Sequence, residues 1–365
     1  MRDYIFHNLP RPKTRASEYT RQCRQLVILL HKPSPTYEYY ISQRVSLYKE
    51  MGLPVHVLTN EVADTSILEN SFVIICRYIR HKQLNWLEKN KSILAGVGLL
   101  IDDDIASVIS DREAPAGYKV FAGYLGLLPL RRLNSLLSIV WVSTPGLEQT
   151  LNSADCKTAV LSPFPEMTQS LSSDHNHESI DPGAISKKLR IVYHATVTHF
   201  RGHEFLKPIM ENILKRHTQI SFEVFGRSRA RKLWKNAAIN PSQLEFKSIL
   251  PWPEYVQHCI RNPADVAMAP LFDSDVDNAR SDTKRIDIAR LKAAAIFSSN
   301  SVYTRCRQQN EIFVENNPKL WEEATERLIL DEISRENAVR ATFASVNEMR
   351  CHAIKEFPGI KITLD

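Results

Sequence analysis

Three consecutive aspartates, Asp102, Asp103 and Asp104, follow the apolar run VGLLI and precede a second apolar stretch that begins at Ile105. Carboxylates this close raise one another's pKa, which would suit one of them to act as a general base. The position also favours a capping residue, because an aspartate oxygen can accept hydrogen bonds from the free N–H groups at a helix start. We therefore predict either a catalytic role for Asp103 or Asp104, or a structural role at the start of a helix.

A second group of polar side chains lies in HATVTHFRGHE, residues 194–204. His194 ends an apolar run, and His199 and Arg201 follow in the next loop. The histidines have no cysteine or carboxylate partner in a recognisable zinc pattern, so we predict no metal ion. The planar fork of an arginine suits phosphate oxygens. We therefore expect His194, His199 and Arg201 to lie at an anion-binding cleft, with His194 as a candidate catalytic residue.

Another cation follows the strand-like segment ISFEVFG, which ends in Gly226. Arg227 comes directly after it. We expect Gly226 and Arg227 to contribute either to the same cleft or to the solvated start of a basic helix.

The stretch from residue 272 to 299 combines a polar loop with a helical pattern. Asn278 and Arg280 lie in the loop, and Ser281 is expected to cap a helix whose first turns carry Lys284 and Asp287. Residues three apart share one face of a helix. A helix N-terminus with a lysine favours an anion, and an acid beside it can accept hydrogen bonds from ribose hydroxyls. The alternative is an ordinary capped amphipathic helix with solvated charges.

Short apolar runs alternate with helical patterns through most of the chain, which predicts α/β domains with parallel sheets. Residues 170–188 are rich in Ser, Asp, His and Gly and nearly free of aliphatic side chains, which indicates a linker. We expect strands at 25–31, 53–59, 71–77 and 97–102 before the linker, and at 189–195, 220–226, 244–250, 265–272 and 296–299 after it. Residues 139–151 read as a further strand that enters a helix, with Thr144 as its N-cap, and Gly52 is the expected stop of the helix that follows the first strand.

This pattern predicts two Rossmann-like domains, 1–169 and 189–335, whose parallel sheets face a central cleft. The closing segment 336–365 has a helical stripe of Val339, Phe343, Val346 and Met349, which predicts a helix that packs one face against a core. Ligands of open parallel sheets bind outside the carboxyl ends of the strands, which is where the polar groups above are found.

Composition narrows the class of protein. The chain has 365 residues, a formal net charge of +6 and a pI near 8.9, a modest excess compatible with phosphate-bearing substrates or an anionic membrane surface. It contains no nucleic-acid-binding motif. The six cysteines are scattered singly, as in a reduced cytoplasmic protein. We find no signal peptide and no apolar run of transmembrane length.

The segment GYLGLLPLRRLNSLLSIVW, residues 123–141, mixes leucines with Arg131 and Arg132. Its default interpretation is a buried core helix. The alternative is a patch that contacts a membrane surface, because apolar side chains beside basic ones are typical of interfacial helices.

Taken together, these motifs resemble glycosyltransferases of the GT-B fold, in particular family 4. The likeness lies in the donor-binding stretch 272–299, the opening HKPSPTYEYYISQRVSLYKEMGLPVHVL, VWVSTPGLEQTL and IVYHATVTHFRGHEFLKPIMENIL. The resemblance implies that Asp287 contacts the donor's ribose and Arg201 its diphosphate. It further implies that Asp103 or Asp104 faces the acceptor, and that the closing helix crosses back to the first domain.

What the resemblance implies about function is a transfer of sugar from a nucleotide-sugar donor to a glycan or lipid-linked acceptor. The family predicts retention at the anomeric carbon, a place in cell-envelope polysaccharide biosynthesis, and work at the inner face of the cytoplasmic membrane. It requires no cofactor and no metal, since the Asp-X-Asp metal motif belongs to a different transferase fold.

The sequence departs from the family at three positions. Ala279 replaces the first of two glutamates that are usually eight residues apart, Lys292 replaces a turn glycine, and KPSPTY replaces a glycine-rich loop. Asn278 or Arg280 would then supply the missing donor-sugar contact. These departures leave open an inverting enzyme, a nucleoside-monophosphate-sugar donor, or an inactive sugar-binding or partner subunit.

Overall fold

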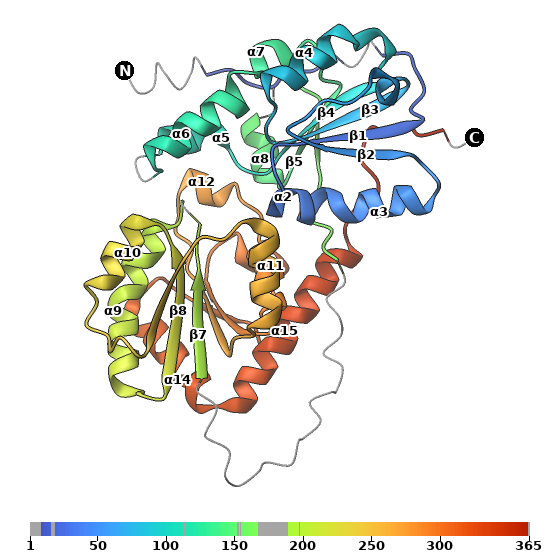
Figure 1. Cartoon of the computed structure of the whole chain (residues 1–365). Coiled ribbons are helices and arrows are strands. Elements are labelled where there is room, and N and C mark those ends of the chain that lie inside the picture. The colour runs from blue at the N-terminus through green and yellow to red at the C-terminus, as the bar shows by residue number, and fades with distance from the viewer. Residues whose placement is uncertain are drawn as a thin grey trace. The chain divides into compact units, whose positions relative to one another are not determined.

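The computed structural model describes residues 9–15, 19–111, 114–151, 153, 155–166, 189–196 and 198–363. The chain forms two compact units, and neither is continuous in sequence (Figure 1). The first unit combines residues 1–165, 274–281 and 352–365, and the second combines 166–273 and 282–351. The expected linker, residues 170–188, lies outside the described residues.

The first unit is built on a parallel sheet in the order β2-β1-β3-β4-β5-β6. Its central strands are fully buried runs of Val, Ile and Leu, as expected for a parallel sheet that is covered on both faces. The strands are β1 (Gln25–Leu30), β2 (Val55–Thr59), β3 (Ser71–Cys76), β4 (Gly96–Ile101), β5 (Ile139–Val142) and β6 (Thr158–Val160).

Short helices connect these strands and cover the sheet, and the last in the list, α12, joins the unit from a later part of the chain (Figure 1). They are α2 (Pro35–Tyr37), η2 (Glu38–Ser42), α3 (Gln43–Glu50), η3 (Thr65–Leu68), α4 (His81–Lys89), η4 (Lys91–Ile93), α5 (Ile105–Ser110), α6 (Ala116–Ala122), η5 (Gly123–Leu127), α7 (Leu130–Leu133), α8 (Pro145–Leu151) and α12 (Asp275–Asn278).

The second unit has a parallel sheet in the order β12-β11-β10-β7-β8-β9. Its strands are β7 (Leu189–His194), β8 (Ile220–Gly226), β9 (Leu244–Ser248), β10 (Val266–Ala269), β11 (Ala294–Ser298) and β12 (Ile312–Val314). This is the strand order of dinucleotide-binding folds. The chain reverses direction across the sheet between β7 and β10, so a ligand is expected at the carboxyl ends of these two strands.

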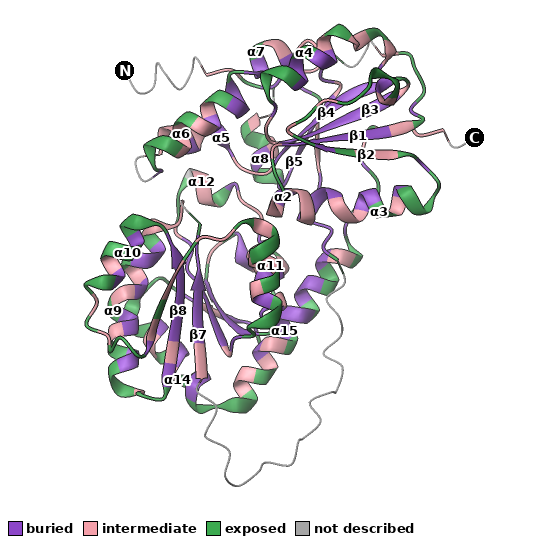
Figure 2. Cartoon of the chain, viewed as in Figure 1, coloured by how far each residue is buried: buried purple, intermediate pink, exposed green. Residues whose placement is uncertain are grey.

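Longer helices flank this second sheet, and Figure 2 shows buried strands between helices with exposed outer faces. The helices are α9 (Phe200–Arg216), α10 (Ser228–Lys235), α11 (Trp252–Arg261), α13 (Lys284–Arg290), η6 (Tyr303–Cys306), α14 (Pro318–Leu330) and α15 (Glu332–Cys351). Trp234 and Trp321 are fully buried among aliphatic side chains from these elements.

The expected strands all exist, each within about three residues of its predicted bounds. The short edge strands β6 and β12 were not predicted. Local stop and start signals are confirmed: Gly52 has a left-handed φ of +85°, and the Thr144 hydroxyl accepts a hydrogen bond from Leu147 N at 3.1 Å at the start of α8. Ser281 does not cap α13, whose N-cap residue is Thr283.

The closing segment differs from the expectation. Helix α15, with its buried Phe343, Val346 and Met349, belongs to the second unit, where it contacts α13, α14 and β11. Only the tail after it, residues 352–365, belongs to the first unit. The apolar stripe therefore packs within the second unit.

Residues 123–141 form mostly core structure, with Leu125, Leu127, Leu130 and Leu133 buried. Within the described part of the chain, no helix has both the length and the apolar character needed to cross a membrane.

Candidate functional site

The three aspartates follow β4 in the first unit, and the structure gives each a different environment. Asp102 accepts a hydrogen bond from the Thr36 hydroxyl at 2.5 Å and pairs with Arg77, whose Nε lies 2.9 Å from Asp102 Oδ1. Burial is the main cause of a raised Asp102 pKa, with Asp103 adding to it and Arg77 opposing it.

Asp103 lies between two arginines. Its Oδ2 is 2.9 Å from Arg77 Nη2, and its Oδ1 is 3.5 Å from Arg280 Nε. Burial acts to raise the pKa of Asp103, but Arg77 and Arg280 outweigh it and the pKa is lowered. The expectation that neighbouring carboxylates would raise this pKa is wrong for Asp103. The two guanidinium groups stabilise the charged carboxylate more than the neighbouring acids destabilise it. Asp103 is a weak proton acceptor and a firmly held anion.

Asp104 is the N-cap of α5, so the capping alternative describes its environment. The Ser107 N–H donates to Asp104 Oδ1 at 3.1 Å, and the Ser107 hydroxyl donates to the other oxygen. The side chain is buried. Both oxygens therefore already have partners.

Arg77, which the sequence analysis missed, organises this cluster. It follows β3 with a left-handed φ of 63°, a conformation that costs energy for any residue with a Cβ. Besides pairing with Asp102 and Asp103, its guanidinium lies over the Tyr78 ring at 5.1 Å. A single arginine at the end of an apolar run gave no signal in sequence, because its acidic partners come from another strand.

The polar loop predicted to contact the donor lies largely in the first unit. Arg280 pairs with Asp103 and with Asp277, each at 3.5 Å, and Asn278 is exposed at the end of α12. Ser281 Oγ lies 2.5 Å from the Tyr40 hydroxyl. Ala279, in place of the family glutamate, is buried in the core of the first unit.

His194 ends β7 in the second unit and forms a buried network with Glu223. His194 Nε2 is 2.8 Å from Glu223 Oε1, and His258 Nε2 is 3.0 Å from the same oxygen. Burial is the main cause that lowers the pKa of His194 to about 4, so the ring is neutral near pH 7. Arg190 and Lys247 also contact Glu223, at 2.6 and 3.1 Å.

These three side chains could also hold a metal ion, since their ligand atoms all lie within 4.8 Å of one another. His194 does have a carboxylate partner, Glu223, which the spacing within residues 194–204 could not reveal. Two fixed cations already neutralise Glu223, however, and they would repel a divalent ion. The network therefore fits a rigid support for the end of β7 better than a metal centre.

Lys284 and Asp287 share a face of α13, as predicted, with Lys284 Nζ 3.7 Å from Asp287 Oδ2. The ammonium also donates to the His194 carbonyl at 2.7 Å, which holds it at the carboxyl end of β7. Arg290 contacts the other Asp287 oxygen at 3.3 Å. An ammonium and a carboxylate are thus fixed beside the reversal point of the second sheet, the place where open parallel sheets bind their ligands.

The other predicted site residues of the second unit follow the carboxyl ends of β7 and β8. Arg201 is exposed near the start of α9 and lies over the Phe272 ring at 4.3 Å, and the His199 carbonyl accepts a hydrogen bond from Tyr193. Gly226 ends β8 with no room for a side chain, because a Cβ would lie 2.7 Å from Ala230. Arg227 is exposed at the start of α10.

No protein family model matches the sequence, and no curated protein matches it. Among solved structures, HepE of Anabaena in complex with UDP and glucose has a TM-score of 0.53 and 9% identity, covering 89% of this chain and 95% of HepE. HepE was also solved with UDP-glucose.

Two further structures share the fold. Trehalose-6-phosphate synthase, studied for glycosyl transfer with retention, has a TM-score of 0.52 and 8% identity, covering 89% of this chain and 96% of the synthase. TarM, solved from S. aureus, has a TM-score of 0.50 and 10% identity. That match covers 84% of this chain and 54% of TarM, so the chain spans about half of TarM's length.

These similarities establish the class of fold. The chain has the GT-B fold of glycosyltransferases, with two Rossmann-like α/β units and two six-stranded parallel sheets.

Proposed function

We propose that this protein is a glycosyltransferase that moves a sugar from a nucleotide-sugar donor to a glycan or lipid-linked acceptor. The observation that carries the proposal is the Lys284 and Asp287 pair on α13, at the reversal point of a sheet with the GT-B strand order. The solved complexes of HepE with UDP and glucose, and with UDP-glucose, support the same ligand class.

In this reaction the bond between the sugar's anomeric carbon and the diphosphate oxygen breaks, a bond to an acceptor hydroxyl oxygen forms, and the proton of that hydroxyl passes to the departing diphosphate. Lys284 and Arg201 stabilise the negative charge on the departing diphosphate, while Asp287 accepts hydrogen bonds from the ribose. Retention at the anomeric carbon is part of the proposal, supported by the fold shared with trehalose-6-phosphate synthase.

Nucleotide binding tests the donor site. We expect Lys284→Ala to weaken UDP binding at least tenfold, because a charged hydrogen bond contributes about 1.5 to 3 kcal/mol. Isothermal titration calorimetry measures the affinity, and Lys232→Ala, an exposed lysine on α10, is the matched control. Equal UDP affinity in a folded Lys284→Ala protein would remove Lys284 from the site.

A catalytically inactive sugar-binding or partner subunit is the second candidate, and Ala279 favours it. A glutamate at this buried position would have to place its charge in the core of the first unit. Hydrolysis of nucleotide sugars, measured over a donor panel without acceptor, separates the two candidates. Turnover supports the enzyme, whereas binding without turnover supports the subunit.

We also propose peripheral contact with an anionic membrane through the α6–η5 stripe, which consists of Val120, Tyr124 and Leu128. These side chains recur every four residues and are 72%, 55% and 51% exposed. Lys119 and the exposed Arg131 lie close to them in sequence. Apolar side chains that can enter a bilayer, with cations that attract anionic lipid, are typical of an interfacial surface.

Vesicle co-sedimentation tests this surface. We expect the double variant Val120→Asp with Leu128→Asp to bind phosphatidylglycerol vesicles at least tenfold more weakly. Ile333→Asp, at a 73% exposed apolar position on α15, is the control and should bind like the wild type. Equal loss in the control, or equal wild-type binding to neutral vesicles, would contradict the proposal.

A further inference from the structure

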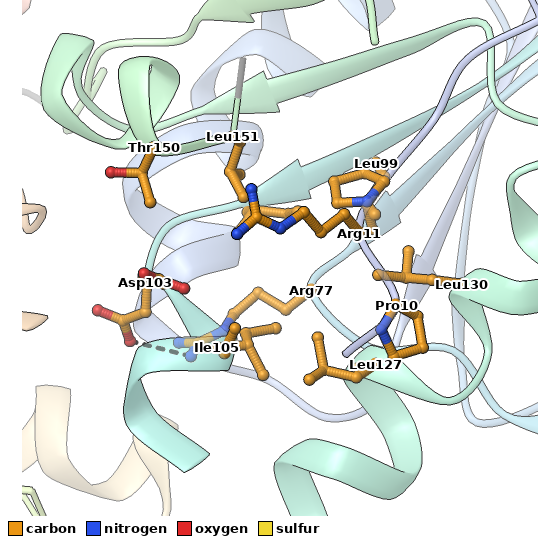
Figure 3. Close-up of a pocket in the computed structure, with 15 residues that line it drawn as sticks. Pro10, Arg11, Arg77, Leu99, Asp103, Ile105, Leu127, Leu130, Thr150 and Leu151 are labelled. Atoms are coloured by element: carbon orange, nitrogen blue, oxygen red, sulfur yellow. Dashed lines mark hydrogen bonds and ion pairs between the residues drawn. The ribbon is translucent and has the colours of Figure 1, made fainter. Parts of the chain in front are cut away.

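Two groups of charged side chains outside the proposed donor site differ in their balance of sign. The small pocket beside the aspartate cluster is lined by two arginines, Arg11 and Arg77, and by two carboxylates, Asp103 and Asp104 (Figure 3). Arg77 and Asp103 pair with each other there. The charges of this pocket therefore balance, and they select neither an anion nor a cation.

Helix α10 of the second unit is different, because its charges are all positive. The sequence RSRARKLWK, residues 227–235, contains five Lys or Arg residues and no acid. The formal net charge of the whole chain is +6, so the rest of the chain has a net charge of only +1. The positive excess of this protein is therefore concentrated at one short helix.

The four cations within the helix are all exposed, and together we call them the α10 basic face: Arg229, Arg231, Lys232 and Lys235. Buried Ala230 and Trp234 fix the opposite side of the helix to the core of the second unit. Figure 2 shows α10 on the outside of this unit. The face is thus presented to solvent by a helix that is itself held firmly.

The four cations repel one another. Lys232 is three residues from both Arg229 and Lys235, and Lys235 is four residues from Arg231, spacings at which side chains are neighbours on a helix surface. Arg229 has an ion pair with Glu204 at 3.8 Å, but both of these side chains are exposed. The side chains of Lys232 and Lys235 make no hydrogen bond or ion pair among the described residues. A bound polyanion would relieve this repulsion.

Aromatic rings orient two of the guanidinium groups. Arg229 lies over the Phe200 ring at 3.6 Å, and Arg231 lies over the Phe246 ring at 4.7 Å. Stacking uses the flat side of a guanidinium and leaves N–H groups at its edge for carboxylate or phosphate oxygens. These arginines are therefore ordered before a ligand binds, which reduces the entropy lost on binding.

The surroundings of the face restrict the kind of anion. Among the described residues of α10, no large hydrophobic side chain is exposed, whereas a helix that enters a membrane surface and the core of a protein interface both need them. The Phe200 and Phe246 rings are covered by the arginines, so they offer no platform on which nucleic-acid bases could stack. Ser228 and Asn236, exposed at the two ends of the helix, can bond to hydroxyl groups. A hydroxyl-rich polyanion fits these properties best.

We propose that the α10 basic face binds an anionic glycan, a sugar polymer with acidic groups along its length. The face recognises charge and not the kind of acid, so a polymer of uronic acids is a suitable probe. The inference rests on the proposed function only for the choice of a glycan among polyanions. It goes beyond that function, because sugar transfer does not require a charged glycan. No covalent step occurs at this face.

Calorimetry with oligogalacturonate tests the inference, and its methyl ester is the matched neutral ligand. We expect oligogalacturonate to bind at least tenfold more tightly than the methyl ester or monomeric galacturonate, because only the polymer meets several cations at once. Its affinity should fall as ionic strength rises.

Variants assign the binding to the face. Arg231→Gln with Lys235→Gln should weaken oligogalacturonate binding about tenfold, because two charged contacts are lost. Lys215→Gln with Lys319→Gln is the matched control. It removes two exposed lysines from α9 and α14 of the same unit, lowers the net charge equally and should bind like the wild type.

A charge reversal separates binding from folding. The Lys235 side chain makes no contact that the fold could lose, so Lys235→Glu should keep the melting temperature and weaken binding more than Lys235→Gln does. Lys215→Glu, at an exposed position on α9, should leave binding unchanged. UDP affinity should stay unchanged in every one of these variants, because the proposed donor site lies on α13 and not on α10.

Three results would overturn the inference: equal affinity for the methyl ester, full affinity in Lys235→Glu, or tighter binding of single-stranded DNA or phosphatidylglycerol vesicles than of oligogalacturonate. UDP binding by the wild type separates this failure from failure of the proposed function. A protein that binds UDP but not oligogalacturonate retains the donor site and loses the inference. A protein that binds neither loses both.

Discussion

Two buried histidines make the stability of the second unit dependent on pH. Burial lowers the pKa of His194 and of His203 to about 4, whereas an unfolded histidine has a pKa of about 6.5. Because the folded pKa is the lower one, each ring contributes stability that is fully present above pH 6.5. That stability is lost as pH falls toward 4, because in this range the histidine is protonated in the unfolded chain but not in the folded chain.

Replacing one of these rings isolates its contribution. His203 Nδ1 lies 3.0 Å from Trp234 Nε1 and accepts its hydrogen bond, and His203→Gln keeps an acceptor but cannot titrate. We expect this variant to lose about 2 kcal/mol less stability than the wild type between pH 7 and pH 5. Urea unfolding at the two pH values measures the difference. Equal losses in both proteins would show that His203 is protonated in the folded state.

Residue roles could be predicted from sequence where the contact is local. The cap at Thr144 and the capping alternative for Asp104 depend on N–H groups three residues away, so the sequence contains both partners in one short stretch. Arg77 and Glu223 were missed because their partners come from other strands. Long-range pairs of this kind need the sheet order, which a single sequence does not supply.

At the level of elements, the buried strands could be predicted because short apolar runs that alternate with helical patterns are typical of strands in a buried parallel sheet. The edge strands β6 and β12 are three residues each, too short to give a periodic signal. The π-helices η2 and η5 were also missed, since a π turn differs from an α turn by one residue and has no distinct sequence pattern.

One departure from the family pattern has a visible structural consequence. Lys292, in place of the usual turn glycine, adopts a φ of 54° between α13 and β11. The left-handed turn is thus retained although the residue that favours it is absent. The fold tolerates the substitution because such strain costs only about 1 to 2 kcal/mol.

On the scale of the whole molecule, the order of the chain does not match the division into units. Residues 274–281 and 352–365 join the first unit although the second unit's sequence surrounds or precedes them. Composition gives no sign of either return, because residues 274–281 form a short polar segment and residues 352–365 have the same mixture of apolar and polar side chains as the rest of the chain. A sequence indicates a domain boundary where a linker separates two domains. It gives no such signal where the chain passes from one domain to the other within a few residues.

The returning tail is packed into the first unit by specific contacts. The buried Phe357 ring stacks on Tyr48 with centroids 5.9 Å apart, and the Trp141 indole N–H donates to the Pro358 carbonyl at 2.9 Å. Buried Arg44 donates from Nε to the Ile354 carbonyl at 2.9 Å. The last residues of the chain thus stabilise strands and helices formed by its beginning.

Phe357→Ala should therefore destabilise the first unit by about 3 to 5 kcal/mol, the usual cost of removing a buried phenylalanine. Hydrogen exchange locates the effect: amides of β1 and β5 should exchange faster, while those of β7 and β8 should keep their rates. Ile354→Ala is the control within the same tail, because that side chain is 50% exposed and only its backbone is bound. Faster exchange in β7 and β8, or an equal effect of Ile354→Ala, would contradict the assignment of the tail to the first unit.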